Sequence, residues 1–323
     1  TNMRFFITGA TGYVGGAVTE QAIAQGHTVH GLSRNEAGDA KLKALGAIPI
    51  RGDLKSLDVL RQETAQADAV CHLAYIHDFT ANYEDILAID AAAVDALAEP
   101  LRGTNKALVI TSGTLVTEPD PEGGETDETS PPLKNPIVDR LRSEKHALSK
   151  AKEGVRVSAI RLTPYVHGRG GSGFIPMLLD HAAKSGESIY IDDGATHTSG
   201  VNVDDAATMY LLAVEKSKPG DVWNCCEDNS VSIKDLAGAV GEVMKAPAKS
   251  ITVEEATKRG GHFLALILTL ANRPSNKKAK RELGWEPKRL DILEDVRAGS
   301  YSGLAEKLLQ GEDGVKHYST ESA

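Results

Sequence analysis

Three glycines near the start of the chain are spaced as in loops that bind the phosphates of a dinucleotide. Gly9, Gly12 and Gly15 follow a short apolar run and precede residues with helical periodicity. Gly9 permits a tight strand-to-helix turn, Gly12 lets backbone approach a pyrophosphate, and Gly15 lets helix and sheet pack closely. The helix N-terminus then offers N–H groups and a positive dipole end to the phosphates. The spacing and its context therefore predict a dinucleotide site.

The segment after the second expected strand holds groups that choose between NAD and NADP. A carboxylate there would bind the 2′-hydroxyl of the adenosine ribose, but Ser33 and Arg34 stand in its place. A hydroxyl and a guanidinium suit a 2′-phosphate, so the sequence favours NADP (NADPH) over NAD, with Glu36 as a rival carboxylate. Asp53 follows the third expected strand. It accepts from the adenine amino group, caps the helix that starts near Ser56, or does both.

Several short stretches have the residue types of one known family in the same order. They lie at 8–15 (TGATGYVG), 52–54 (GDL), 72–74 (HLA), 111–114 (TSGT), 164–168 (PYVHG), 203–205 (VDD) and 283–287 (LGWEP). The chain thus resembles the extended short-chain dehydrogenase/reductases, in the epimerase/dehydratase group. The resemblance implies a catalytic Ser or Thr at the end of the fifth strand, where Ser112 falls. With the reasoning above, it implies the following cofactor contacts: Gly9, Thr11, Gly12, Tyr13, Val14, Gly15, Ser33, Arg34, Asp53, Leu54, Leu73, Ala74, Thr111 and Pro164.

The helix where this family places its catalytic pair departs from the family pattern. The family has Tyr, three residues and then Lys, whereas Arg140 and Glu144 stand at the matching positions. A shift of one residue puts Lys145 at the lysine position but Leu141 at the tyrosine position. Neither register contains a tyrosine, so the resemblance implies an atypical branch without the usual proton donor.

Two interpretations of Arg140 and Glu144 are open. In the first, they form an i,i+4 ion pair on a helix face, which contributes about 0.3–0.5 kcal/mol. In the second, they also face the nicotinamide and are catalytic. Glu144 then accepts from the ribose hydroxyls and Arg140 stabilises a developing alkoxide, without acting as an acid because a guanidinium keeps its proton.

Hydride transfer to a carbonyl needs a proton from some other group. Tyr165 lies on a turn that lines the cleft in related proteins, and His77, beside Asp78, follows on the loop after strand four. Each is a candidate catalytic residue, and each also suits a structural role. A water is the third candidate source of the proton. Ser112 can orient the carbonyl oxygen, but its hydroxyl is too weak an acid to act alone.

The substrate indications are mostly negative. Residues 192–205 contain no Lys or Arg to hold a diphosphate, which disfavours nucleotide sugars. We therefore expect NADP-dependent reduction of a small, largely apolar ketone, aldehyde or imine. The alternatives are a dinucleotide-binding sensor or scaffold without turnover, and a non-redox isomerase or dehydratase with Glu144 or His77 as base. An apolar set either lines the substrate pocket or belongs to the core: Phe174, Met177, Leu178, Phe263, Leu264 and Ile267.

The elements that must position these groups alternate along the chain. Strands are expected at 5–7, 28–32, 47–50, 69–73, 107–110 and 155–160, and helices at 14–25, 40–45, 57–64, 83–97 and 137–152. Such alternation predicts an α/β fold, a doubly wound parallel (Rossmann) sheet. We expect residues 1–165 to form this dinucleotide-binding domain, with a return segment near 201–215. Residues 166–323 then form a smaller, interleaved substrate-binding region, and the acidic, proline-rich segment 118–136 forms a loop able to move.

Composition limits the classes of function. The chain has 323 residues, and 36 Lys and Arg against 45 Asp and Glu give a net charge of −9, which argues against nucleic-acid binding. The longest apolar run, at 263–270, spans roughly 12 Å as a helix, well below a bilayer's hydrocarbon layer of about 30 Å. We therefore expect no membrane span.

The cysteines and the start of the chain bear on location and assembly. Three cysteines, Cys71, Cys225 and Cys226, have neither metal-site nor disulfide spacing. From Arg4 the chain enters a strand directly, so we expect no secretory leader and a reducing, cytoplasmic location. The resemblance implies a small-molecule substrate. It also implies a homodimer through 83–97 and 137–152, although no residue requires one.

Overall fold

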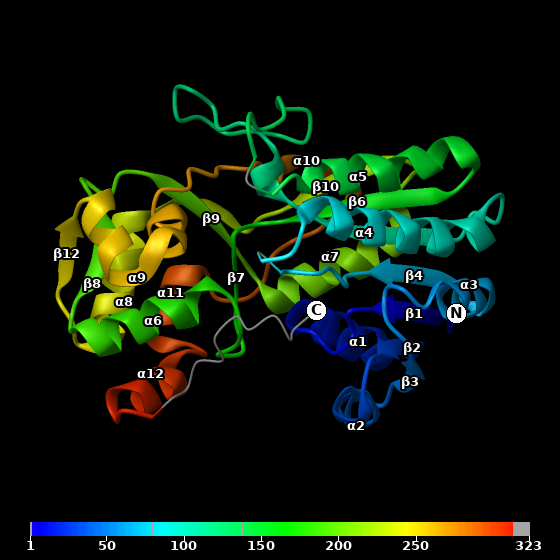
Figure 1. Ribbon diagram of the computed structural model, residues 1–323, viewed down its shortest axis with the longest axis horizontal. Coiled ribbons are helices and arrows are strands. Elements are labelled where there is room, and N and C mark those ends of the chain that lie inside the picture. The colour runs from blue at the N-terminus through cyan, green and yellow to red at the C-terminus, as the bar shows by residue number, and fades with distance from the viewer. Residues whose placement is uncertain (1, 79, 137, 313–323) are drawn as a thin grey trace.

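The computed structural model describes residues 2–78, 80–136 and 138–312, and its centre is a parallel sheet. The sheet has seven strands in the order β10-β6-β5-β4-β1-β2-β3 (Figure 1). They are β1 (Arg4–Thr8), β2 (Thr28–Ser33), β3 (Ile48–Arg51), β4 (Ala69–His72), β5 (Ala107–Gly113), β6 (Arg156–Leu162) and β10 (Asp221–Cys225). The strand order reverses between β1 and β4, which is where doubly wound sheets bind ligands. The predicted α/β fold is confirmed.

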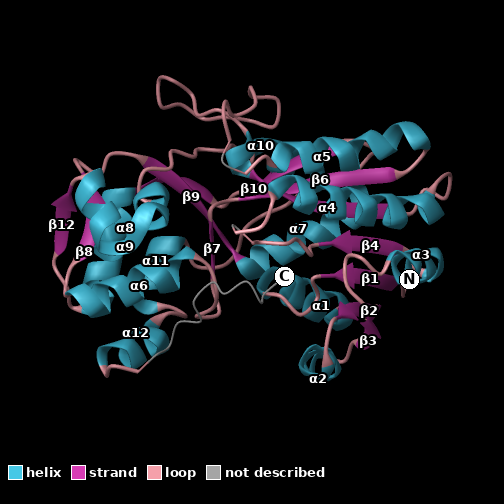
Figure 2. Cartoon of the chain, viewed as in Figure 1, coloured by secondary structure: helices cyan, strands magenta, loops and turns pink. Residues whose placement is uncertain are grey.

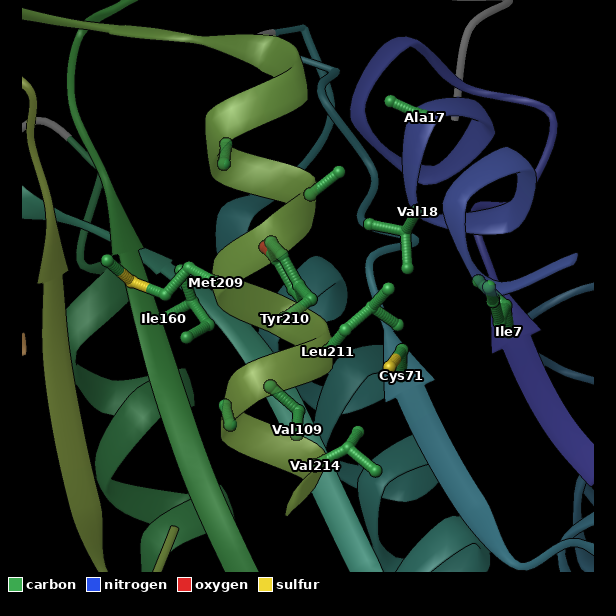
Figure 3. Close-up of a cluster of buried hydrophobic side chains, with 14 of the residues drawn as sticks. Ile7, Ala17, Val18, Cys71, Val109, Ile160, Met209, Tyr210, Leu211 and Val214 are labelled. Atoms are coloured by element: carbon green, nitrogen blue, oxygen red, sulfur yellow. The ribbon is translucent and has the colours of Figure 1, made fainter. Parts of the chain in front are cut away.

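Each strand sends alternate side chains to opposite faces, so each face has its own core. Phe5 and Ile7 of β1 join the cluster on one face, whereas Phe6 joins the cluster on the other. The first face packs against α1 (Tyr13–Ala24), α2 (Glu36–Leu45), α7 (Val203–Lys216) and α10 (Lys277–Leu283). The second face packs against α3 (Leu57–Gln66), α4 (Tyr83–Ala98) and α5 (Arg140–Ser149). Figure 3 shows Met209, Tyr210 and Leu211 of α7 lying over the first face.

The second region builds a separate core beside the sheet (Figure 2). Its helices are α6 (Phe174–Ser185), α8 (Ile233–Met244), α9 (Val253–Ile267), α11 (Ile292–Ala298) and α12 (Ser302–Leu309). One small sheet has the order β11-β9-β7, from β7 (Tyr165–His167), β9 (His197–Asn202) and β11 (Asp228–Ser232). The other pairs β8 (Ser188–Ile191) with β12 (Ala248–Ile251). The chain returns to the first core at α7, within the expected segment, and also at β10 and α10.

Capping side chains set two helix boundaries that differ from expectation. α2 begins at Glu36 because the Asn35 side chain accepts from the N–H of Gly38. α5 begins at Arg140 because the Asp139 side chain accepts from the N–H of Arg142. Residue 137, the expected start of that helix, lies outside the described residues. Short 3₁₀ turns complete the first region: η1 (Glu99–Leu101), η2 (Thr114–Val116) and η3 (Lys150–Glu153).

The acidic loop at 118–136 contains no helix or strand, as predicted. It is fastened rather than detached, because bridges join Thr117 to Pro132 and Thr126 to Pro274. Arg273 also donates to the carbonyl oxygen of Gly123 at 2.7 Å. These contacts argue against the expected mobility and tie the loop to the segment before α10. Within the described residues, no helix has both the length and the apolar character to cross a membrane.

Candidate functional site

The glycine loop has a shape that only glycine permits at two positions. Gly9 has a φ of +71°, and a Cβ there would lie 2.7 Å from the backbone nitrogen of Ala74. A Cβ at residue 15 would lie 1.9 Å from the carbonyl oxygen of Gly9. A Cβ at the exposed Gly12 would meet only that same oxygen, at 3.1 Å. Gly12 is therefore an exposed glycine at the N-terminus of α1, and its exposed backbone suits the approach of a phosphate.

Hydrogen bonds hold the other expected cofactor residues along the carboxyl ends of neighbouring strands. The N–H groups of Leu73 and Ala74 donate to the carbonyl and hydroxyl oxygens of Thr8, at 3.1 and 3.2 Å. The Thr111 hydroxyl donates to the carbonyl oxygen of His72 at 3.0 Å. Pro164 lies between β6 and β7, close to the end of the same sheet edge. The edge is thus continuous from the glycine loop to β6, as a bound dinucleotide requires.

The segment after β2 has more structure than the sequence suggested. The buried Ser33 donates to the carbonyl oxygen of Asn35 at 3.0 Å, and Arg34 is exposed. Lys41, which sequence reasoning missed, donates its amine to the carbonyl oxygen of Thr11. Asn35 caps α2 and so turns residue 41 toward the glycine loop. Two cations therefore lie near the expected place of the ribose.

The remaining adenine-side residues serve the loop itself. The exposed Asp53 carboxylate accepts from the N–H of Lys55 at 2.8 Å and from the Ser56 hydroxyl at 3.2 Å, in the turn before α3. Leu54 is buried in the core of the second face. Tyr13 extends away from the loop and donates to the carbonyl oxygen of Gly168 at 2.5 Å. Tyr13 thereby joins the glycine loop to the second region.

Ser112 lies at the end of β5 with its side chain directed into the protein. The residue is 5% exposed. Its hydroxyl oxygen is buried and has no hydrogen-bond partner among the described residues. A buried hydroxyl without a partner is costly, so its partner is expected to be a bound molecule or a water. This geometry suits a group that holds a substrate oxygen.

Arg140 is held against an aromatic ring rather than against Glu144. Its guanidinium carbon lies 3.6 Å from the centre of the Tyr75 ring, and its Nη2 donates to the carbonyl oxygen of Thr111 at 2.7 Å. Its Nη1 is buried and has no partner among the described residues. Arg140 thus places a cation at the carboxyl ends of β4 and β5, one residue from Ser112.

The expected ion pair between Arg140 and Glu144 is wrong. Glu144 is 2% exposed, and its two carboxylate oxygens accept from Arg161 of β6 at 2.9 and 2.6 Å. The two oxygens are therefore engaged in a buried fork. This bidentate arrangement makes Glu144 a structural partner of Arg161. It argues against contact of Glu144 with a nicotinamide ribose and against Glu144 acting as a base.

A buried polar chain runs beneath this edge of the sheet. The Thr8 hydroxyl lies 2.7 Å from Nδ1 of His72, whose Nε2 lies 3.3 Å from the carboxylate of Asp90 in α4. Burial opposes ionisation of Asp90, but His72, Arg140 and Ser143 together hold its pKa below the ordinary value. A small cavity is lined by His72, Asp90, Arg140 and Ser143. The carboxylate therefore supplies a counter-charge beneath Arg140. Sequence reasoning missed Asp90. The signal that could have found it is an acidic residue on the buried, apolar side of the helix expected at 83–97.

His77 does not have the properties of the expected proton donor. Its ring centre lies 5.4 Å from that of Tyr75, edge to face. Surrounding protein atoms and the positive charge of Arg140 lower the pKa of His77 to about 4. The neighbouring Asp78 carboxylate accepts from Thr80 instead. His77 is thus a neutral imidazole near pH 7, a state that cannot supply an acidic proton.

Tyr165 is enclosed in the second core and does not line a cleft. It is 1% exposed, and its ring stacks edge to face on Phe174 at 5.4 Å. Its hydroxyl faces the carbonyl oxygen of Ile267 at 3.4 Å, and burial raises its pKa above the ordinary value. The expectation that Tyr165 donates a proton to substrate therefore does not fit its position.

His167, the last residue of β7, binds two carboxylates from later segments of the second region. It is fully buried, with Nδ1 at 2.7 Å from Asp295 and Nε2 at 2.5 Å from Glu227. Burial opposes its charge, but the two carboxylates outweigh that effect and raise its pKa to about 9. His167 is therefore an imidazolium that clamps β7 to the segments at 227 and 295.

Comparisons with known proteins identify the family and show the same fold in solved structures. The family model described as "NAD dependent epimerase/dehydratase family" matches residues 5–226. An uncharacterized protein of Saccharomyces cerevisiae is 37% identical over 298 residues, covering 92% of this chain and 98% of its own length. The 4-hydroxy-2-methyl-3-oxo-4-farnesyl-3,4-dihydroquinoline-1-oxide ketoreductase of Stigmatella aurantiaca is 25% identical over 316 residues, covering 88% and 92%. The crystal structure of gox2253 has the same fold, with a TM-score of 0.76 at 22% identity, covering 96% of this chain and 99% of that one.

Proposed function

This chain belongs to the NAD-dependent epimerase/dehydratase family, and on that premise we propose that it is an NADP-dependent oxidoreductase. Its substrate is a small, largely apolar ketone, aldehyde or imine, which it reduces by hydride transfer. The observation that carries the proposal is the buried hydroxyl of Ser112, which has no partner among the described residues. Its chain neighbour Thr111 binds the Arg140 guanidinium through its carbonyl oxygen. A relative named as a ketoreductase supports the same reaction class.

The dinucleotide would lie along the carboxyl edge of β1, β4 and β5. The exposed backbone of Gly12 would take the pyrophosphate, and Leu73, Ala74 and Thr111 would contact the nicotinamide half. The bound cofactor supplies hydride. Arg34 and Lys41, with the Ser33 hydroxyl, would recognise a ribose 2′-phosphate, because Ser33 and Arg34 stand at the end of β2, where a carboxylate usually binds the 2′-hydroxyl of NAD. Glu36 and Asp39, which hydrogen-bonds Ser33, are the rival carboxylates nearby.

Ser112 and Arg140 would hold the substrate oxygen. The Ser112 hydroxyl donates a hydrogen bond to it, and the free Nη1 of Arg140 places positive charge where negative charge develops. Both groups are held in advance, Ser112 by β5 and Arg140 by Tyr75 and Thr111. Preorganised donors of this kind stabilise a transition state without reorganisation at the moment of reaction.

The substrate side of the cleft would be apolar. Phe174 and Phe263 stack at 5.7 Å between α6 and α9, and Phe263 is 38% exposed. Leu178, Leu264 and Ile267, from the same apolar set, are buried in the second core and are therefore structural. The absence of Lys and Arg from residues 192–205 suits a small uncharged substrate better than a nucleotide sugar.

The test is a titration with NADPH and NADH, followed by nicotinamide fluorescence. We expect tighter binding of NADPH, and Arg34→Asp should weaken it by about ten- to hundredfold, the scale of one or two charge-assisted hydrogen bonds. Lys41→Ala should weaken NADPH binding in the same way, whereas Arg281→Asp, at an exposed arginine of α10, should not. Equal affinity for NADH and NADPH in every variant would contradict the NADP assignment.

Turnover is tested with a panel of ketones, aldehydes and imines at saturating NADPH. Oxidation of NADPH that depends on one of these compounds supports a reductase. Binding of NADPH without oxidation across the whole panel would contradict it, and would favour a sensor or scaffold. Conversion of a compound without net change in the nicotinamide would instead favour an isomerase or dehydratase.

A further inference from the structure

The proposed reduction needs a proton donor, and none of the residues considered so far can supply the proton. When a carbonyl carbon accepts hydride, its oxygen becomes an alkoxide and must take a proton. Arg140 keeps its proton, the Ser112 hydroxyl is a weak acid, His77 is neutral, and Tyr165 is enclosed. The candidates that remain are a water and the other side chains at the carboxyl edge of β4 and β5.

Two tyrosines of that edge meet at their hydroxyl groups. Tyr75 follows Ala74 after β4, and Tyr83 is the first residue of α4. Their hydroxyl oxygens lie 3.0 Å apart. The Asn82 side chain accepts from the N–H of Glu84 at 3.0 Å, and this cap fixes where α4 begins and so where Tyr83 stands. The pair thus connects the two ends of the loop between β4 and α4.

Arg140 connects this pair to the rest of the site. Its guanidinium lies over the Tyr75 ring at 3.6 Å, while its Nη2 is bound to the carbonyl oxygen of Thr111, the neighbour of Ser112. Tyr75 is 5% exposed, whereas Tyr83 is half-buried. One phenol therefore lies inside, under the cation, and the other reaches toward solvent.

We propose that Tyr75 and Tyr83 act as one proton-donating pair for the substrate oxygen, oriented by the Arg140 guanidinium. This proposal rests on the reductase function above. The carbonyl carbon gains hydride from reduced nicotinamide dinucleotide, and the oxygen gains a proton from a phenol O–H bond, which breaks. The resulting phenolate takes a proton from its partner phenol, and the partner takes one from water. The sum is carbonyl, reduced dinucleotide and one proton giving alcohol and oxidised dinucleotide.

The charges around the pair suit this role. Burial and the Tyr75 hydroxyl raise the pKa of Tyr83, and Asp139 acts in the same direction, whereas Arg140 opposes them. The raised pKa keeps the Tyr83 phenol protonated at neutral pH. The alkoxide of a secondary alcohol is a stronger base than a phenolate, so the proton transfer remains downhill. Arg142, which pairs with Glu84, and the neutral His77 complete the titratable neighbours.

The experiment measures single-turnover hydride transfer in Tyr75→Phe, Tyr83→Phe and the double variant. Phenylalanine keeps the ring under Arg140, so the fold should persist, and thermal melting followed by circular dichroism checks it. We expect each single variant to lose about 10²- to 10⁴-fold in rate, the usual contribution of a positioned acid. The double variant should lose no more than the worse single one, because the two phenols work as a unit. Tyr190→Phe, at a half-buried tyrosine of β8, should match the wild type.

Two further measurements separate this proposal from others. NADPH binding by fluorescence should be unchanged in all three variants, since the phenols serve the substrate oxygen. The rate should stay level between pH 6 and 9, whereas an imidazolium donor would lose activity across that range. Wild-type rates in both single variants would overturn the proton-donating pair and leave the reductase intact. A wild-type protein that reduces no carbonyl overturns both, and that failure appears before any variant is made.

Discussion

Glu144→Lys would restore the residue type that the resemblance places at this position, and we predict that it destabilises the fold. Glu144 is 2% exposed and Arg161 is 5% exposed, and two hydrogen bonds of 2.9 and 2.6 Å join them. Arg161 also donates to the carbonyl oxygen of Glu128 at 3.2 Å, and this hydrogen bond attaches the acidic loop at 118–136 to β6. A lysine at 144 would remove the counter-charge and bury a second cation beside the first.

The magnitude follows from the burial of the pair. Removing one partner of a buried ion pair costs about 3–5 kcal/mol because the other charge is left uncompensated, and a second cation adds to that cost. With an unfolding entropy of roughly 2.1 cal/mol/K per residue over 323 residues, this corresponds to a fall in Tm of about 4–7 °C or more. Glu144→Gln, which keeps the shape, should lie at the lower end of the range.

The assay is unfolding followed by tryptophan fluorescence, since Trp223 and Trp285 are 1% and 0% exposed and both report the folded core. The matched control is the double variant Glu144→Met with Arg161→Met, which removes both charges together. We expect it to lie within about 1 kcal/mol of the wild type, because a buried pair contributes little net stability over apolar side chains. A Glu144→Lys protein that melts within a degree of the wild type would refute the structural role of this pair.

Other predictions concern the clamp and the glycine loop. The pKa of His167 is raised from 6.5 to about 9 by Asp295 and Glu227, so its contribution of about 3 kcal/mol is complete below pH 6.5 and is lost as pH rises through 9. Urea unfolding across pH 6–10 should show this loss, and His167→Gln should flatten the profile. Gly15→Ala should unfold the loop, since its Cβ would lie 1.9 Å from a backbone oxygen, and melting and NADPH fluorescence should both fall. Gly12→Ala should lower NADPH affinity but leave the melting temperature near that of the wild type.

The elements that the sequence predicts well are those set by local pattern. Short apolar runs predicted six of the seven strands, because strands of a parallel sheet are mostly covered on both faces; the exposed edge strand β3 is the exception. β10 was missed because Asp221–Cys225 mixes polar and apolar residues and lies far along the chain, after the second region has begun. The glycine loop was recognisable because Gly9 and Gly15 each answer a local steric demand.

The partners of charged and polar side chains were not predictable, since they come from distant strands. Glu144 and Arg140 share a helix face at i,i+4 spacing, yet each has a stronger partner elsewhere. The Arg161 guanidinium contacts Glu144, and the Tyr75 ring contacts Arg140, only once β6 and β4 have packed beside α5. Tyr165 likewise lies on the expected turn, but its ring points into a core that residues after 174 create.

Arg140 stands where the resemblance implies a tyrosine. Charge stabilisation and proton donation at the substrate oxygen would then fall to different residues. A tyrosine can both stabilise the developing charge and donate the proton, whereas a guanidinium can do only the first. Nη1 of this guanidinium has no partner in the part of the chain that the structure describes, and the guanidinium lies over the ring of Tyr75, whose hydroxyl we propose as the acid. The buried carboxylate of Asp90 keeps the site from carrying an uncompensated cation before substrate arrives. If the proposed function holds, the two roles of the family's tyrosine would be divided between Arg140 and Tyr75, whose side chains touch.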